Sequence, residues 1–287
     1  TLYVSNTDPT CNGKSPCYTT IQAAVNVVLP GDTIQIQAGI YHEKVTISGK
    51  NNTTTATEAD RIIIEADPLF APGSVIVTGT SHQCTDGEAI QVKRSRFITI
   101  SGLTITSAGG PAISLVGGGI NKNQAIHIER NRVFDNGSSE CDGGITVVQQ
   151  NPGTLIVNNL IYDNGGNGIS LISADEGSLY IVNNAIHTNH WNGVRVVQSR
   201  EVFIFNNIIT QNGAADGATG GRYGLLREGS PKLQPQEIHL LNNLICGNRL
   251  AQVKGPVLDS TDSGNLTPKG TEGPRVAASP GCGIPAN

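Results

Sequence analysis

Short apolar runs alternate with turns rich in Asn and Gly along most of the chain, and the pattern repeats. The unit is about 24 residues long and holds three apolar runs, which in its clearest copy are Leu155–Val157, Leu160–Tyr162 and Ile169–Ile172. Such a unit predicts a solenoid with three strands in each coil and a coil spacing of about 4.8 Å. The sequence therefore predicts an all-β fold, a parallel β-helix.

Two columns of Asn mark the turns of the repeat, and the second column follows the first by five residues. Asn side chains at equivalent turns can bond to the Asn above and below, which satisfies their buried amides. FITISGLTITSAGG (97–110) resembles an earlier coil, with Gly102 near the Asn column. We expect two ladders, formed by Asn131, Asn159, Asn184, Asn207 and Asn243 and by Asn136, Asn164, Asn189, Asn212 and Asn248.

Two other architectures are compatible with a repetitive, strand-rich chain. Leucine-rich repeats have a comparable period, but their leucine spacing is absent here. Antiparallel sandwiches have many short strands, but they do not repeat their turn chemistry this regularly. The β-helix is therefore favoured over both.

The N-terminal segment contains the one clear helical pattern. Ile21, Ala24, Val25 and Val28 follow the spacing i, i+3, i+4, i+7, and Pro30-Gly31 ends the pattern. A solenoid needs a cap over the exposed end of its core, so we expect this helix to be that cap. We expect a single domain over 1–287, with a strand, loop and capping helix in 1–30, coils in 31–248 and a tail packed on the solenoid in 249–287.

The strand before each Asn pair is apolar on both faces in the middle coils. Alternation should turn Ile128, Ile156, Ile181, Ile204 and Leu240 inward and their neighbours outward. Something should cover an outward apolar strip of this size, either the tail or a second copy of the protein. The expected interface consists of Leu155, Val157, Tyr180, Val182, Phe203, Phe205 and Leu241.

The composition agrees with many short strands and excludes several classes of protein. Of 287 residues 35 are Gly and 26 are Asn, whereas 15% are charged and 4% are aromatic. A chain so poor in charge is not a helical bundle, and its net charge of -4 does not suggest a nucleic-acid partner. No run of about 18 apolar residues is present, so we expect no transmembrane segment.

Six scattered cysteines without an initiator Met suggest a processed, secreted or cell-surface protein with disulfides, although six buried thiols in a cytosolic protein would also fit. No Cys/His cluster has zinc spacing, so no metal and no cofactor is expected. Cys11 and Cys17 share a short loop, and Cys246 with Cys282 would tether the tail, which leaves Cys84 for Cys141. Cys84 and Cys141 would lie one coil apart, so their loops must lean over the small residues Ser107–Ala112.

Residues 2–47, LYVSNTDPTCNGKSPCYTTIQAAVNVVLPGDTIQIQAGIYHEKVTI, resemble the opening of secreted right-handed parallel β-helix proteins of the pectate-lyase-like superfamily. The resemblance rests on the TIQAAV helix, the PGDTI turn and the GIY that follows, and the Asn-rich coils extend it over most of the chain. It implies the fold but leaves the function open, because this fold serves lyases, epimerases, hydrolases, adhesins and inert surface proteins alike.

The sequence lacks the motifs of the enzymes with this fold. The paired aspartates of polygalacturonase-like hydrolases and the DPHE element of mannuronan epimerases are absent. Calcium-dependent β-elimination needs several converging carboxylates and a basic residue. The outward column on the strand that follows each long turn carries one cation and no carboxylate, and consists of Gln91, Ser114, Thr146, Ser170, Arg195 and Leu226.

Another outward column carries titratable and aromatic side chains that could take part in catalysis or sugar binding. Tyr162 and His187, one coil apart, could act as acid and base at a sugar carbon, with Arg195 neutralising a carboxylate. Asp163, His190 and Trp191 lie beside them, and an indole face can stack on a sugar ring. These residues are also ordinary choices for a solvated surface, and His187-x-x-His190 has too little around it to hold a metal.

A basic run and three insertions interrupt the regular coils. Lys93, Arg94 and Arg96, together with Arg130 and Arg132, could bind a uronate or sulfate chain, although such a run is more often a solvated turn, which is the favoured interpretation. The insertions cover 49–60, 137–144 and 213–223, and insertions often line the working face of a solenoid.

Two functions remain in competition at this point. One is an extracellular β-helix with a structural, adhesive or self-assembling role at the cell surface, with glycan binding as part of it. The other is an enzyme on an acidic polysaccharide, a lyase, epimerase or hydrolase. The expected partners are an extracellular polysaccharide and further copies of the chain. The missing motifs favour the first function, and the breadth of the fold favours the second.

Overall fold

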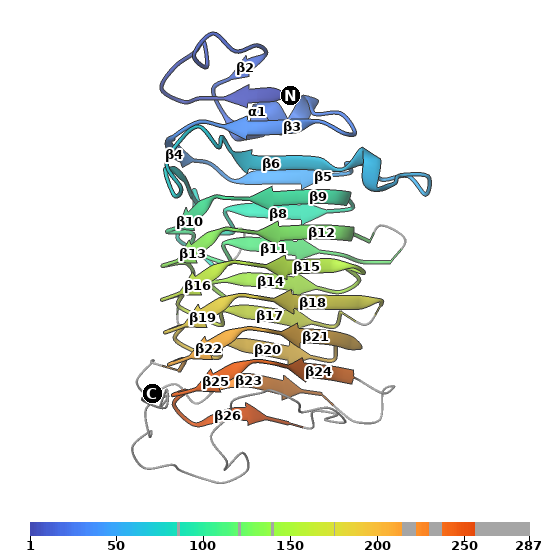
Figure 1. The fold of residues 1–287 in the computed structure, drawn as a ribbon, viewed down its shortest axis with the longest axis vertical. Helices are drawn as coiled ribbons and strands as arrows, with labels where there is room; N and C mark the ends of the chain where they lie inside the picture. The colour runs from blue at the N-terminus through green and yellow to red at the C-terminus, as the bar shows by residue number, and fades with distance from the viewer. Residues whose placement is uncertain are drawn as a thin grey trace.

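Residues of each coil form three short strands because β-branched side chains alternate inward along them and tight turns separate them. A computed structural model describes residues 1–84, 87–119, 122–138, 141–174, 176–213, 222–229 and 237–255. Within this part of the chain the strands make three parallel sheets, called A, B and C here, which run side by side along one axis (Figure 1). The fold is the predicted parallel β-helix.

Sheet A has ten strands. In spatial order they are β2 (Cys17–Tyr18), β1 (Leu2–Val4), β3 (Thr33–Ile36), β6 (Ile62–Ala66), β9 (Arg96–Ser101), β12 (Gln124–Glu129), β15 (Thr154–Val157), β18 (Ser178–Val182), β21 (Glu201–Phe205) and β24 (Glu237–Leu241).

Sheets B and C have eight strands each. Sheet B consists of β4 (Gly39–His42), β7 (Val75–Thr78), β10 (Thr104–Thr106), β13 (Arg132–Phe134), β16 (Leu160–Tyr162), β19 (Ala185–His187), β22 (Ile208–Thr210) and β25 (Leu244–Cys246). Sheet C consists of β5 (Val45–Ser48), β8 (Ile90–Lys93), β11 (Ile113–Val116), β14 (Ile145–Val148), β17 (Ile169–Ile172), β20 (Val194–Val197), β23 (Tyr223–Glu228) and β26 (Ala251–Lys254). β26 continues the coils past residue 248, where the sequence repeat ends.

The predicted register is correct. Ile128 pairs with Ile156 and Ile181 with Ile204, and all four side chains are buried, as is Leu240. The predicted column of sheet C also pairs as expected, from Ile90 through Ile113 to Leu225, which is the third residue of β23. The core is thus a stack of aliphatic side chains that point inward from the three sheets.

The two Asn ladders are present, and every member is buried. Asn159 Nδ2 donates to Asn184 Oδ1 at 3.0 Å, and Asn184 Nδ2 donates to Asn207 Oδ1 at 3.0 Å. The second ladder repeats this geometry from Asn136 to Asn248 at 2.9–3.0 Å. Side-chain amides therefore satisfy the backbone at the A–B and B–C corners of each coil.

Two further ladders were not expected. Asn123 Nδ2 donates to Asn151 Oδ1 at 2.8 Å at the corner between sheets C and A. Asn192 bonds to Asn167, which in turn bonds to Asp142, in the loops before sheet C. Their members are scattered through less regular turns, so the sequence repeat does not align them.

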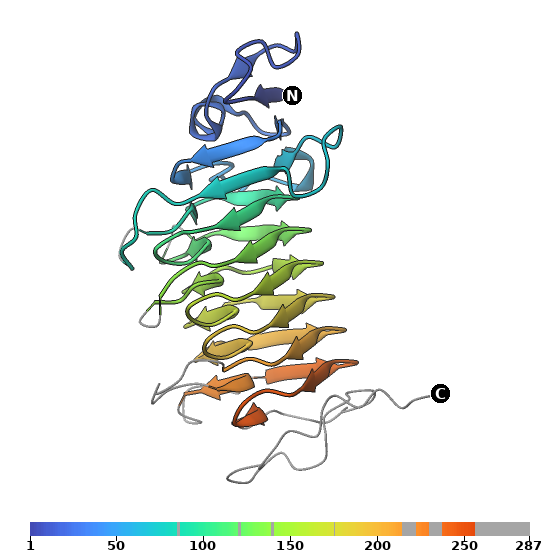
Figure 2. The same cartoon turned by 90° about the vertical axis from the view of Figure 1, so that its left-hand side faces the viewer.

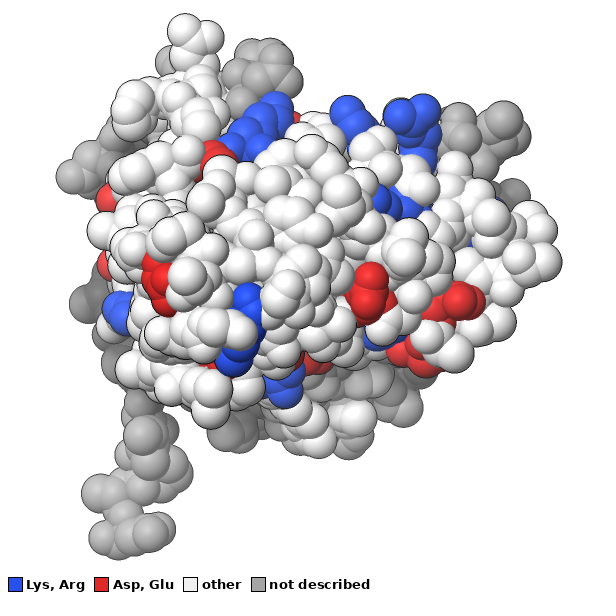
Figure 3. Space-filling model, turned by 90° about the horizontal axis from the view of Figure 1, so that it is seen from above, with Lys and Arg blue, Asp and Glu red and all other residues white. Residues whose placement is uncertain are grey.

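The predicted helix caps the N-terminal end. α1 (Ile21–Val27) buries Ile21, Ala24 and Val25 against the core, and the Glu43 carboxylate accepts the N–H groups of Ile21 and Gln22. Figure 3 looks onto this end of the molecule, where uncharged residues cover most of the surface and Lys and Arg are scattered, several of them along the upper edge of the view. The 3₁₀ turn η1 (Glu58–Asp60) lies in the first insertion.

Two disulfides join described residues. Cys11 pairs with Cys17, and Cys84 pairs with Cys141 with a Cα–Cα distance of 5.4 Å, both as predicted. Cys282, the expected partner of Cys246, and the tail from residue 256 lie outside the described residues. No helix among the described residues is long and apolar enough to cross a membrane.

Candidate polysaccharide groove

A groove of about 800 Å³ runs across the corner between sheets A and B, near the middle of the solenoid. One wall is the loop 67–74, which joins β6 to β7 and stands out from the coil, as Figure 2 shows. The floor is the corner of the next coil, Ser101–Thr104. The far wall belongs to the coil below and consists of Arg130, Asn131 and Arg132, followed by Asn158 and Leu160.

A buried ion pair fixes the loop that forms the first wall. The Asp67 side chain is 1% exposed, and Lys14 Nζ bonds to its Oδ2 at 2.8 Å. Asp67 also accepts the N–H of Leu69 at 3.0 Å. Lys14 comes from the disulfide-closed N-terminal loop, and its charge lies 4.8 Å from the Tyr3 ring centroid. The cap of the solenoid therefore holds this wall in place.

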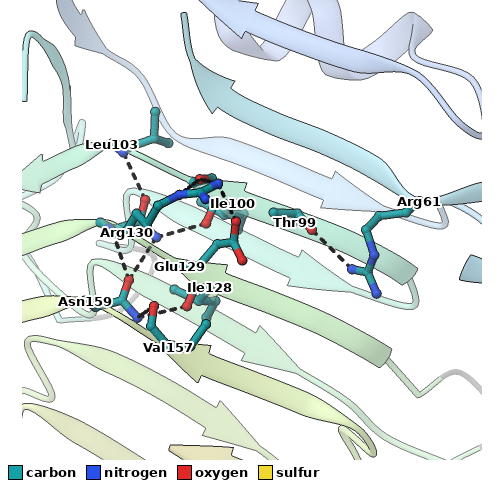
Figure 4. A network of polar contacts seen from close by, with 11 residues as sticks. Arg61, Thr99, Ile100, Leu103, Ile128, Glu129, Arg130, Val157 and Asn159 are labelled. Carbon is teal, nitrogen blue, oxygen red and sulfur yellow. Dashed lines mark hydrogen bonds and ion pairs between the residues drawn. The ribbon is translucent and has the colours of Figure 1, made fainter. Parts of the chain in front are cut away.

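Arg130 lies at the turn of the opposite wall with a φ of 55°. Its Nη2 bonds to Glu129 Oε1 at 2.6 Å and to Ser101 Oγ at 3.0 Å, so the side chain reaches back to the coil above (Figure 4). The side chain is still 62% exposed. Its charge is therefore partly balanced by Glu129 and remains accessible from the groove.

Arg132 is the second cation of this wall, and aromatic side chains hold it. Its Nε donates to the Tyr162 hydroxyl at 2.7 Å, and its guanidinium lies 5.0 Å and 5.4 Å from the ring centroids of Phe134 and Tyr162. No carboxylate of the described residues forms an ion pair with Arg132. Arg132 is thus an exposed, oriented and unneutralised cation at the groove.

Tyr162 and His187, the predicted acid–base pair, lie side by side, but Arg195, the cation predicted to assist them, lies elsewhere. Tyr162 and His187 stack with ring centroids 5.2 Å apart, and Phe134 stacks on the other face of Tyr162 at 5.0 Å. Arg195 lies on sheet C instead, and its Nε donates to Glu228 Oε2 at 2.8 Å. The residue next to Tyr162 is Arg132.

Stacking restricts how these rings can meet a sugar. Rings on neighbouring strands cover each other's faces, so the middle ring, Tyr162, presents its edge outward. A sugar that stacks on an aromatic ring needs a free face. Hydrogen bonding and charge are therefore what this column offers to a ligand.

The other predicted glycan-binding residues lie at two different corners. Asp163 and His190 are exposed at the B–C corner beside the second Asn ladder, where the backbone N–H of Trp191 donates to the Gly166 carbonyl at 3.1 Å. The basic run lies at the C–A corner, where Arg94 bonds to Ser48 and Arg96 to the Thr53 carbonyl, next to Lys93 in β8. None of these residues lines the groove.

The outward column of sheet C has the predicted composition but is less open than expected. Ser114, Thr146 and Ser170 pair in register, and all three are buried. The hydroxyls of Thr146 and Ser170 are buried and have no hydrogen-bond partner, and the same holds for Trp191 Nε1. The strand register thus places the six predicted residues in one column, and none of them is a carboxylate.

The predicted apolar strip lies on the outward face of sheet A. Phe203 stacks between Tyr180, at 5.0 Å, and His239, at 4.6 Å, and meets Phe205 edge-on at 5.6 Å. The seven predicted interface residues are all partly exposed. Its covering by a second copy or by the tail remains a prediction, since the tail lies outside the described residues.

A buried arginine organises the same sheet above the strip. Arg61 donates to the carbonyls of Ile98 and Ala125 at 3.3 Å and 3.1 Å and to Thr99 Oγ1 at 3.2 Å (Figure 4). Its Nη2 lies 3.3 Å from His127 Nε2, which accepts. Burial, and then the charge of Arg61, lowers the pKa of His127 from its ordinary value. The lowered pKa favours the neutral imidazole over the charged one.

The groove was missed from sequence for a geometric reason. Arg130 and Arg132 flank Asn131 of the ladder, and the sequence suggests the basic run as their partner, but that run lies at another corner. The loop 67–74 has no counterpart in the repeat and gives no signal of its own. The sequence feature that could have revealed the groove is the pair of arginines on either side of Asn131, a buried turn residue.

Known proteins share this architecture. A family model described as "Right handed beta helix region" matches residues 69–245. Pectate lyase Pel9A superposes with a TM-score of 0.66 at 14% identity, over 88% of this chain and 64% of that one. ORF18 of Geobacillus virus E2 gives 0.59 at 12% identity, over 81% and 46%. A pectin methyl esterase of the rice weevil gives 0.53 at 14% identity, over 80% and 75%.

The chain spans less than two thirds of the first two of these proteins. At such identities the likeness shows the fold alone. It is one fold with several chemistries, so the side chains of this chain have to carry the argument about function.

Proposed function

The chain belongs to the right-handed β-helix family, and on that premise we propose that it is an extracellular protein that binds an acidic polysaccharide in the groove between sheets A and B. The role is adhesive or structural rather than catalytic. Two disulfides among the described residues support an oxidising compartment. Two of the similar structures bear the names of a pectate lyase and a pectin methyl esterase, which supports this class of ligand.

Arg132 is the observation that carries the proposal. This exposed guanidinium forms no ion pair with a carboxylate of the described residues, and it is held by the Tyr162 hydroxyl and by the rings of Phe134 and Tyr162, so it is ready to donate to a ligand carboxylate. Arg130 lies two residues away on the same wall. The groove of about 800 Å³ is within the range of ligand sites, about 300–1,000 Å³. A chain with regularly spaced carboxylates matches these features.

Affinity electrophoresis in gels that contain polygalacturonate, alginate or the neutral glucan dextran tests this proposal. The parent protein should be retarded by at least one acidic polymer and not by dextran. The Arg132→Gln variant should bind at least tenfold more weakly, because a charge-assisted bidentate contact contributes about 1.5–3 kcal/mol.

Arg94→Gln is the matched control, because Arg94 is an exposed arginine that bonds only one hydroxyl at the C–A corner. It should bind like the parent. An equal loss in both variants would move the site to the basic run, and no retardation by any acidic polymer would refute the proposal.

An enzyme on acidic polysaccharide is the second candidate, and one contact favours it. The Tyr162 hydroxyl accepts a hydrogen bond from Arg132, which lines the groove, so a uronate that bound Arg132 would come close to this hydroxyl. β-Elimination makes an unsaturated uronate, so ultraviolet absorbance should rise when the protein is mixed with these polymers. A rise that Tyr162→Phe abolishes would establish this function in place of simple binding.

A further inference from the structure

A second cluster of polar side chains lies on sheet A, far along the solenoid from the groove. Glu201 and Glu237 are the first residues of β21 and β24 and are directly paired, and His239 follows on the same face of β24. Their ligand atoms all lie within 4.8 Å of one another. A pocket of about 330 Å³, lined by Gly177, Arg200, Glu201 and Glu237, opens beside them.

The two carboxylates are poorly compensated as they stand. Like charges directly opposite each other on neighbouring strands destabilise a sheet. Among the described residues, Glu201 accepts a bond from the Ser178 hydroxyl, and Glu237 lies 3.5 Å from His239 Nε2. Arg200 lines the pocket without forming an ion pair with either carboxylate. In the part of the chain that the structure describes, no Lys or Arg bonds to either carboxylate, so only His239, when protonated, can offset their charge.

The imidazole is an independent sign of a missing ligand. The His239 side chain is 32% exposed, but its Nε2 is itself shielded from solvent and forms no hydrogen bond, and the nearest carboxylate oxygen, on Glu237, is 3.5 Å away. A buried polar nitrogen without a partner costs free energy, so native proteins seldom keep one. The ring is also held in place, because it stacks on Phe203 at 4.6 Å with an interplanar angle of 10°. A fixed, unpartnered nitrogen thus faces two carboxylates.

We propose that Glu201, Glu237 and His239 bind a divalent transition-metal ion, with Zn²⁺ as the best match. Zn²⁺ takes imidazole nitrogen and carboxylate oxygen at about 2.0–2.2 Å, and three protein ligands leave a fourth position open. Tetrahedral ligands at that distance lie about 3.4 Å apart, so side-chain rotation must shorten the longest separation, at most 4.8 Å, by up to about 1.4 Å. The open position faces the pocket, where Arg200 would favour an anionic fourth ligand.

A bound ion would stabilise the C-terminal end of sheet A in the described chain. It joins β21 to β24, which are the last two strands of sheet A in the described chain. Binding to the folded state alone raises stability by mass action. The site should therefore show itself as zinc-dependent stability, whether or not the groove binds a polysaccharide.

Thermal unfolding of the full chain after treatment with EDTA is the primary experiment. ZnCl₂ at about 100 times its dissociation constant should raise the unfolding midpoint by about 5 °C or more, and CaCl₂ and MgCl₂ should not. Calorimetric titration with ZnCl₂ at 20 °C should show one saturable site per chain.

Two variants and a control make the result decisive. Glu201→Gln should lose the zinc effect and, in EDTA, melt at or above the parent midpoint because the repulsion is gone. His239→Gln should lose the calorimetric binding. Glu228→Gln, which removes an exposed strand-end carboxylate on sheet C, should keep both effects. Absence of zinc binding by the parent, or unchanged binding in Glu201→Gln and His239→Gln, would overturn the proposal.

Discussion

Buried side chains with fixed hydrogen-bond partners hold neighbouring coils together, and Asn184 is an example. Its amide donates to the carbonyls of Ile156 and Val182 and to Asn207, while its oxygen accepts from the N–H and the amide of Asn159. Every polar atom of this buried side chain is in use. An apolar side chain of the same size at a ladder position would therefore leave polar groups of the neighbouring coils without hydrogen-bond partners.

Asn184→Leu should lower the free energy of unfolding by about 2–4 kcal/mol, because it leaves polar groups of both neighbouring coils unpaired. Urea unfolding followed by circular dichroism measures this loss. Asn183→Gly is the matched control, because Asn183 is exposed and has a φ of 55°, which Gly adopts freely. A parent-like midpoint for Asn184→Leu would show that the ladder is dispensable.

Stability should also depend on the protonation of His127. Its pKa is lowered in the folded state by burial and by Arg61, with Glu58 and Glu129 acting in the opposite direction. The unfolded chain therefore takes up this proton more readily, and stability should fall as the pH drops below about 6.5 towards the folded pKa. Below that pKa this group causes no further loss.

Urea unfolding of the parent and of His127→Gln at pH 7.5 and pH 5.0 tests this dependence. The parent should lose stability between the two values, and the variant should lose less, since Gln can still accept from Arg61. His190→Gln, at an exposed position, serves as the control and should follow the parent. Equal losses in all three proteins would contradict the role given to His127.

At the scale of elements, the sequence determined the strands and the ladders but not the groove. Strand faces follow from local alternation, and the Asn turns are local chemistry, so both could be predicted from residues such as Ile156 and Asn159. The groove needs Asp67, Ser101 and Arg130 from three successive coils, and their approach depends on a loop outside the repeat. Sequence spacing placed Arg94 with Arg130, but a coil has three corners and they occupy different ones.

The disulfide between Cys84 and Cys141 ties two loops across an intervening coil. It spans 57 residues, and the loop-closure model assigns about 4 kcal/mol to such a cross-link. The variant Cys84→Ser/Cys141→Ser should unfold with about that loss of free energy, measured by urea titration without reductant. A loss below about 1 kcal/mol would mean that the loops are held by their packing instead.

A glycine in the coil between the two disulfide-linked loops allows the loops to pack closely over that coil. A Cβ at Gly109 would overlap the backbone of His82 and Gln83. Gly109→Ala should therefore cost about 3 kcal/mol or more. Gly118→Ala should cost less than about 1 kcal/mol, because its close neighbour is the mobile end of the Gln149 side chain. Differential scanning calorimetry compares the two, and equal midpoints would show that the loops can shift to admit a methyl group.

The whole molecule is a stack in which each coil contacts mainly its neighbours, so stability should vary along the axis. The middle strands of every sheet have a partner on both sides, whereas β24, β25 and β26 each have one among the described strands. Hydrogen exchange read by mass spectrometry should be slowest in β12–β20 and fastest in β24–β26. A single rate over all coils would instead indicate that the solenoid opens only as one unit.

The Asn ladders have a consequence for how such a molecule can change its length. Asn159 and Asn184 offer the same donor and the same acceptor to the coil above and the coil below, so the chain between them is an interchangeable cassette. A second copy of residues 159–183 inserted after Asn183 would meet the same bonding pattern at both ends. The fold can thus be lengthened or shortened by whole cassettes, about 4.8 Å at a time, while the groove and the cap stay as they are.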